Sequence, residues 1–196
     1  RGEIVNRSLV GINKGRLKIW KFPQPYRDYA LGVDVSEGIN QDDSSIQVFD
    51  ILSMEQVAEW YSDNTPPEEV AIKAAELGSY YNYAKIAVEA NNHGYTTINS
   101  LQDLRYKHLF KMKRFDVKKR KDTERLGWYT NARTKPIMVD KYLELLRSGD
   151  IILNSQILVD QMSTFVLRED GSMGSTGSYK DDVLMGAMIG VMCALS

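Results

Sequence analysis

Short apolar runs that alternate with polar positions dominate the first part of the chain. Residues 29–35 (YALGVDV) form an apolar run, residues 45–49 alternate, and residues 56–61 (QVAEWY) alternate again. Alternation with a period of two is typical of half-buried strands, and the polar segment between the first two runs is typical of a hairpin connection. The pattern therefore predicts three consecutive antiparallel strands.

A helical period follows the third run. Apolar residues recur every three or four positions from Pro66 to Tyr81, and Glu68 and Glu69 lie in the first turn, where acidic side chains favour a helix start. Residues 85–89 (KIAVE) are then short, apolar and β-branched, which is typical of a buried strand. Strands, a helix and a further strand in this order predict an α/β fold.

The remaining pattern predicts shorter elements and loops. Residues 91–94 and the glycine- and serine-rich residues 170–178 are expected to be loops, and residues 1–28 are irregular apart from an expected edge strand at 17–22. The other expected elements are a strand at 109–112, an extended segment at 151–153, and helices at 96–105, 135–147, 155–161 and 180–195.

Composition is that of an ordinary soluble domain. The chain has 196 residues, of which 43% are hydrophobic and 26% charged, and such a length buries a core without metals or disulfides. The single cysteine, Cys193, excludes an internal disulfide and multi-cysteine metal sites. The longest uncharged run, residues 183–196, is shorter than the roughly 20 residues needed to cross a bilayer, so no membrane partner is expected.

Acidic residues stand where predicted strands end and where the last helix starts. Asp34 ends the first strand, Glu89 ends the fourth, and Asp181 and Asp182 open the final helix. If the two strands are neighbours, these carboxylates gather at one edge of the sheet. Their mutual repulsion would then be relieved by divalent cations, and oxygen ligands suit Mg²⁺ or Mn²⁺.

Two such ions would favour hydrolysis of a phosphodiester. Taken singly, each acid also has a structural interpretation, as a turn former, a solvated strand end or a partner of the helix dipole.

Positive charge is concentrated in one stretch, although the net charge of the whole chain is −1. Seven basic residues lie between Lys111 and Lys121, against the single acid Asp116. Lysine-rich segments neutralise DNA phosphates without reading sequence, and a solvated charged loop is the alternative. The candidate DNA-binding residues in this stretch are Lys113, Arg114, Lys118, Lys119, Arg120 and Lys121.

Four blocks of sequence carry a family resemblance. They are GVDVSEG at 32–38 with DDSSIQVFD at 42–50, VEANNHG at 88–94, GWYTNARTKP at 127–136, and YKDDVLMGAMIG at 179–190. In order and spacing they resemble the nuclease domain of the large terminase subunit of tailed double-stranded DNA bacteriophages. The resemblance covers roughly residues 28–196. It implies a ribonuclease H-like fold, with a central mixed sheet whose first three strands are antiparallel and helices on both faces.

The resemblance also implies an activity and its residues. Members of that family cut concatemeric viral DNA during genome packaging, with acids that hold two metal ions. The corresponding positions here are Asp34, Glu89 and the pair Asp181-Asp182, with Asp182 as the main ligand and Asp181 as a ligand of the second metal or a partner of a water.

Two positions near these acids depart from the family pattern. Asp42 or Asp43 is a weaker candidate ligand, because the loop is one residue longer than the usual pattern. Lys180 stands where histidine is common and would contact phosphate, since a protonated lysine is a poor metal ligand.

Partners are implied in the same way. The family protein carries an ATPase motor and works on double-stranded DNA with a portal and a small terminase subunit, in the host cytoplasm. No GxxxxGK[ST] phosphate loop is present here. We therefore expect residues 1–28 to be a linker or edge segment from a preceding motor domain, and residues 29–196 to be the nuclease domain.

Other functions fit the same residues. A Holliday-junction resolvase or a strand-transfer enzyme would use the same acids, and a DNA-binding or assembly module would keep them for structure alone. His93 is expected to shape the loop beside Glu89 rather than to bind metal. Trp128 and Tyr129 are expected to pack in the core rather than to stack on bases.

Overall fold

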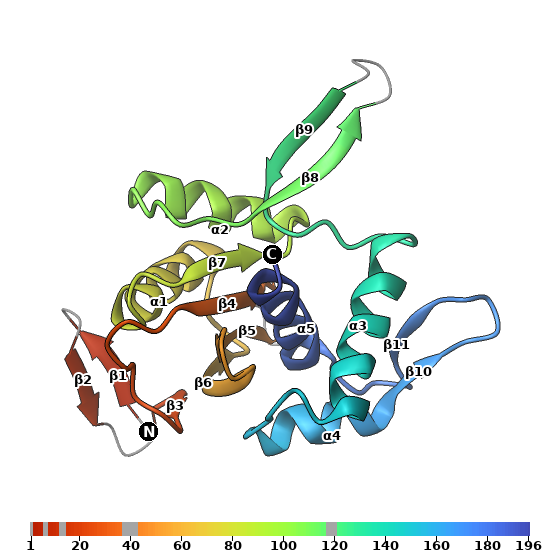
Figure 1. The fold of residues 1–196 in the computed structure, drawn as a ribbon, viewed down its shortest axis with the longest axis horizontal. Helices are drawn as coiled ribbons and strands as arrows, with labels where there is room; N and C mark the ends of the chain where they lie inside the picture. The colour runs from red at the N-terminus through yellow and green to blue at the C-terminus, as the bar shows by residue number, and fades with distance from the viewer. Residues whose placement is uncertain (1, 6–7, 12–14, 37–42, 117–120) are drawn as a thin grey trace.

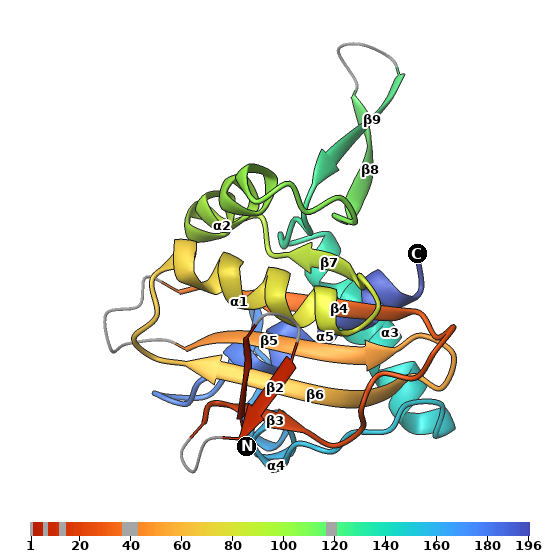
Figure 2. The same ribbon diagram turned by 90° about the vertical axis from the view of Figure 1, so that its left-hand side faces the viewer.

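The computed structural model describes residues 2–5, 8–11, 15–36, 43–116 and 121–196. In these segments a seven-stranded sheet has the order β2-β1-β3-β6-β5-β4-β7 and forms the centre of the molecule (Figures 1 and 2). Its strands are β1 (Gly2–Val5), β2 (Ser8–Gly11), β3 (Leu17–Ile19), β4 (Tyr29–Asp34), β5 (Ser44–Asp50), β6 (Glu55–Ser62) and β7 (Lys85–Val88). The three antiparallel strands predicted from residues 29–61 are β4, β5 and β6, and β7 pairs parallel with β4.

Helices cover both faces of this sheet, as expected. Successive side chains of a strand point to opposite faces, so Leu31 and Val33 of β4 join one buried cluster and Ala30 joins the other. The first cluster packs under α1 (Pro67–Tyr80) and α2 (Asn92–Asp103). The second packs under α3 (Thr134–Ser148), α4 (Gln156–Thr164) and α5 (Asp182–Ala194).

Two expectations about loops were wrong. Residues 91–94 begin α2, because the Asn91 side chain accepts a hydrogen bond from the Gly94 N–H and so caps the first turn. Residues 173–175 are a strand, since β10 (Phe165–Leu167) and β11 (Met173–Ser175) pair antiparallel in a small hairpin.

The basic stretch is also a hairpin. Strands β8 (Lys111–Asp116) and β9 (Lys121–Leu126) form a separate two-stranded sheet that projects from the body of the molecule (Figures 1 and 2). The chain before it and the chain after it both run beside β7. The Phe110 N–H donates to the Ile86 carbonyl and the Trp128 N–H donates to the Val88 carbonyl, each at 2.8 Å. The hairpin is thus an insertion within one edge segment.

The N-terminal residues belong to the same sheet. β3 pairs antiparallel with β6, and β1 pairs with both β2 and β3. The strand expected at 17–22 is present as β3, over Leu17–Ile19, but its expected place at the edge was wrong, because β1 pairs with its outer side. Its attachment to a preceding motor domain stays a prediction.

Close contact between α5 and β4 sets the position of the last helix. A Cβ atom on Gly32 would lie 2.0 Å from the Gly186 carbonyl oxygen and 2.1 Å from the Gly190 nitrogen. Only glycine permits this approach. Because α5 rests directly on β4, its first residues lie at the end of the sheet where β4 finishes.

No helix within the described segments is long and apolar enough to span a membrane.

Candidate functional site

Asp34 and Glu89 leave the sheet at the same edge. β4 and β7 are parallel neighbours with Val33 opposite Val88, and the Glu89 N–H donates to the Val33 carbonyl at 2.8 Å. Parallel strands end at the same edge of a sheet, so the two carboxylates emerge side by side. The neighbouring strands assumed from the sequence are therefore present.

The start of α5 brings two more acids to this edge. Asp181 is the N-cap residue and Asp182 the first helical residue. The Ser45 hydroxyl donates to the Asp182 carbonyl at 2.9 Å, and the Asp43 N–H donates to Asp182 Oδ2 at 3.2 Å. Since β5 lies next to β4, these bonds fix Asp182 beside the end of β4.

Electrostatics shows that the four carboxylates interact. Asp34 is only 7% exposed. Burial raises the pKa of Asp34 well above its usual range, and the charge of Glu89, a hydrogen bond with Glu89, and the charges of Asp182 and Asp181 raise the pKa further. Within the described segments no lysine or arginine forms an ion pair with Asp34. Negative charge is therefore concentrated at this edge without a compensating contact to Asp34.

The four carboxylates at this edge are suitable ligands for a hard divalent cation. All four groups are carboxylates, the ligands that Mg²⁺ and Mn²⁺ prefer. In the part of the chain that the structure describes, no three acidic, histidine or cysteine side chains converge on one point as they stand. Repulsion acts over several ångströms, whereas coordination needs oxygens within roughly 2.0–2.6 Å of one ion. The acids can therefore repel one another although their oxygens do not yet surround one point.

Hydrogen bonds determine the present orientation of two of these acids. The Asn91 side-chain N–H donates to Glu89 Oε2 at 2.8 Å, and the Asp182 carboxylate accepts from Asp43 as described above. Binding of an ion would require the carboxylates to turn toward it.

Asp43 and Lys180 form an ion pair, with Lys180 Nζ 2.9 Å from Asp43 Oδ1. The hydrogen bond to Asp43 raises the pKa of Lys180, so its ammonium group stays charged at this edge. Asp43 is therefore engaged by a cation of the chain itself, while Lys180 brings positive charge close to the acids. The alternative candidate Asp42 lies outside the described residues.

Sequence reasoning missed Arg168. Its guanidinium donates to the Ser175 carbonyl at 2.6 Å. A Cβ atom on Gly174 would lie 3.4 Å from Arg168 Nη1 and 3.5 Å from Asp181 Oδ2. Pairing of β10 with β11 thus brings a second cation and Asp181 to the same glycine, Gly174. The local sequence gives no signal of this, because the approach depends on the hairpin register.

The projecting hairpin carries only some of the predicted DNA-binding side chains within the described residues. Lys113 and Lys121 are exposed on β8 and β9, and the backbone of Arg114 pairs with Thr123. Glu124 stands opposite Lys113, so the two strands carry acidic as well as basic side chains. Lys118, Lys119 and Arg120 lie outside the described residues.

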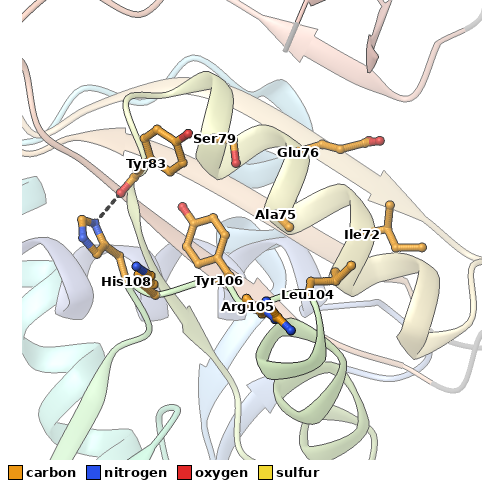
Figure 3. Close-up of a pocket in the computed structure, with 10 residues that line it drawn as sticks. Ile72, Ala75, Glu76, Ser79, Tyr83, Leu104, Arg105, Tyr106 and His108 are labelled. Atoms are coloured by element: carbon orange, nitrogen blue, oxygen red, sulfur yellow. Dashed lines mark hydrogen bonds between the residues drawn. The ribbon is translucent and has the colours of Figure 1, made fainter. Parts of the chain in front are cut away.

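A cavity of about 660 Å³ lies elsewhere, between α1 and the segment 104–108 (Figure 3). Its wall includes Tyr83 and His108, and His108 Nδ1 lies 2.8 Å from the Tyr83 carbonyl oxygen. Tyr83 precedes β7, whereas Glu89 follows it. The cavity therefore lies at the opposite end of that strand and contains none of the four acids.

The two aromatic residues after the hairpin, Trp128 and Tyr129, differ in how deeply they are buried. Trp128 is buried in the second cluster, as expected. The core position expected for Tyr129 was wrong, because its ring is half-buried and packs against the exposed Tyr95. His93 lies in the first turn of α2.

Comparison with known proteins identifies the fold. No family model matches the chain. The structure is similar to the large terminase nuclease from thermophilic phage G20c, with a TM-score of 0.71, 16% identity, and coverage of 92% of this chain and 90% of that chain. The same nuclease with bound magnesium gives a TM-score of 0.72 at 16% identity, over 92% of this chain and 89% of that chain.

A second similar structure is the large terminase nuclease domain of Thermus phage P74-26. Its TM-score is 0.66 at 16% identity, over 91% of this chain and 86% of that chain. These likenesses confirm the expected fold class, an α/β fold with a central mixed sheet, and show that the chain shares the fold of these large terminase nucleases.

Proposed function

We propose that this chain is the nuclease domain of a phage large terminase, a metal-dependent endonuclease that cuts concatemeric double-stranded viral DNA during packaging. One observation carries the proposal. Acids from three distant segments meet where β4 and β7 end and α5 begins, in a fold shared with terminase nucleases, one of which has bound magnesium. A purely structural role would not require three further carboxylates around the buried Asp34.

The acids would hold the ions in unequal ways. Asp34 interacts with Glu89, Asp181 and Asp182, so it would be the central group among the residues that hold the ions. Two Mg²⁺ or Mn²⁺ ions would activate the attacking water and stabilise the leaving oxygen. Asn91 and the Asp43 N–H orient Glu89 and Asp182.

Cations at the same edge would bind the substrate. Lys180 and Arg168 lie close to the acids and can neutralise phosphates of the strand that is cut. The basic hairpin would add contacts to the DNA backbone away from the acids, which raise affinity without reading sequence.

Plasmid digestion tests the activity. We expect the protein to cut DNA in Mg²⁺ or Mn²⁺ and to be inactive in EDTA, with Asp34→Ala as the inactive control. Cutting of plain linear duplex without sequence preference supports the terminase function. A strong preference for branched DNA would instead indicate a resolvase, and metal-independent binding without cleavage would indicate a non-catalytic module.

The proposed context follows from the same function. The chain would act in the host cytoplasm, next to an ATPase motor domain and with a portal and a small terminase subunit. Residues 1–28 would connect it to the motor, and their strands β1 to β3 would attach that connection to the nuclease sheet.

A further inference from the structure

A pair of tyrosines lies at the surface, on the segments next to Glu89. Tyr95 is 43% exposed, and its ring centroid is 6.3 Å from that of Tyr129 at an interplanar angle of 65°. The Tyr95 hydroxyl donates to the Tyr129 hydroxyl at 3.2 Å. Neither ring belongs to the two buried clusters of the described residues, so the pair is held together at the surface.

An arginine completes the group. Arg125 of β9 has its guanidinium carbon 5.9 Å from the centre of the Tyr129 ring. Among the residues that the structure places, Arg125 has no acidic partner within ion-pair distance. Its charge is therefore available to a phosphate while its plane lies over an aromatic ring.

Backbone bonds tie this group to Glu89. The Ala90 N–H donates to the Trp128 carbonyl at 2.7 Å, which places Tyr129 next to the end of β7. The Tyr95 N–H donates to the Asn91 carbonyl at 3.0 Å, so Tyr95 lies in the first turn of the helix that follows Glu89. Tyr95 and Tyr129 therefore belong to the two segments that adjoin the end of β7, where Glu89 leaves the sheet.

The chemistry of the group suits a nucleobase. An exposed tyrosine ring stacks on bases of any sequence, and a neighbouring guanidinium binds the phosphate. A tyrosine phenol is neutral at physiological pH and does not repel phosphates, and the hydrogen bond with Tyr129 raises the pKa of Tyr95 further. Within a duplex the faces of a base are covered by its neighbours, so only an unpaired or frayed base could stack.

We propose that Tyr95, positioned by Tyr129 and Arg125, is a stacking platform for an unpaired base of the DNA strand that passes Glu89. The inference rests on the proposed nuclease function for its substrate and adds that the bound DNA is locally opened beside the acids.

Binding in EDTA separates stacking from cleavage. Single-stranded oligonucleotides that contain 2-aminopurine would be titrated with the full chain at several salt concentrations. Loss of one stacked base weakens binding by about 5- to 150-fold, so Tyr95→Ala should lower affinity by that factor and abolish the fluorescence change on binding. The salt dependence of the affinity should be the same for Tyr95→Ala and wild type, because stacking releases no counterions.

Three variants assign the roles. Tyr95→Trp should restore binding and the fluorescence change, and Tyr129→Phe should weaken both less than Tyr95→Ala, because the ring remains but the hydroxyl contact is lost. Arg125→Ala should flatten the plot of log affinity against log salt by up to about 0.7 for single strands. Tyr26→Ala, at an exposed tyrosine with no ring contact within the described segments, is the control.

Two results would overturn the inference. One is a Tyr95→Ala protein, folded by its melting curve, that binds single strands and changes the fluorescence like wild type. The other is an equal loss of affinity for intact duplex, which would indicate an ordinary backbone contact. Absence of plasmid cutting by the wild-type protein would count against the nuclease function, whereas the binding experiment in EDTA would still decide the stacking role.

Discussion

Asp34 is the most buried of the four acids, and the other three raise its pKa. Replacement by alanine would remove a proposed metal ligand and also relieve the repulsion among the carboxylates. We expect Asp34→Ala to lower cleavage by on the order of a thousandfold, equivalent to several kcal/mol of transition-state stabilisation. Its melting temperature should stay the same or rise.

Plasmid nicking in Mn²⁺ and thermal unfolding measure these two effects. Near wild-type nicking would remove Asp34 from the site. Glu89→Ala should lose activity in the same way but less completely, because Glu89 is less buried than Asp34.

Asp181 and Asp182 should be unequal. Asp182 is fixed by the Ser45 hydroxyl and the Asp43 N–H, whereas the Asp181 side chain makes no capping hydrogen bond. We expect Asp182→Asn to abolish cleavage and Asp181→Asn to slow it or weaken its metal dependence. Metal titration of the activity of both variants compares them, and the reverse ranking would contradict the assignment of Asp182 as the main ligand.

At the scale of elements, the contact between α5 and β4 determines whether the acids meet. Gly32→Ala would place a methyl group against the backbone of Gly186 and Gly190, which cannot move aside as a side chain can. We expect a loss of at least about 3 kcal/mol in the free energy of unfolding, at the upper end for overpacking, together with loss of cleavage.

Urea unfolding measures this loss. Gly11→Ala is the control, because a Cβ atom there would meet nothing within 4 Å. Equal stability of the two variants would show that α5 can shift without cost.

The charge of the β8–β9 hairpin should act on affinity alone. We expect replacement of four basic residues by alanine to make the slope of log affinity against log salt less steep for duplex DNA. The slope should change by up to roughly 3.6, at about 0.9 per phosphate contact. The four residues are Lys118, Lys119, Arg120 and Lys121. Cleavage at saturating DNA should persist, because the acids are untouched. Lys107→Ala, beside the distant cavity, is the control. An unchanged slope in the fourfold variant would show that the basic stretch is a solvated surface that does not contact DNA.

For the whole molecule, the hairpin is separable from the fold. β8 and β9 form their own sheet, and the two buried clusters lie beneath other elements. We expect replacement of residues 113–124 by Asn-Gly, a sequence that favours tight hairpin turns, to change the free energy of unfolding by about 1 kcal/mol at most. The melting temperature should therefore stay within a few degrees of the wild-type value. DNA affinity should fall strongly, and a collapse of stability would show that the hairpin supports the core.

Local patterns were sufficient to predict the main elements. Alternation predicted β4, β5 and β6, and the helical period with its capping residues predicted α1, α3, α4 and α5. These features depend on neighbours in the sequence, which share a face of one strand or one helix. The acids could be selected as candidates for the same reason, since each stands at the end or start of a predicted element.

The sequence by itself determined the order of the elements and the type of residue at their ends. Tertiary structure alone decided that Gly32 admits α5, that Arg168 and Asp181 both approach Gly174, and that Tyr95 meets Tyr129. The first and third of these contacts join segments that are far apart in the chain, and the second depends on how β10 pairs with β11. Their geometry depends on strand register and on close packing, and neither is encoded in the periodicity of a single segment.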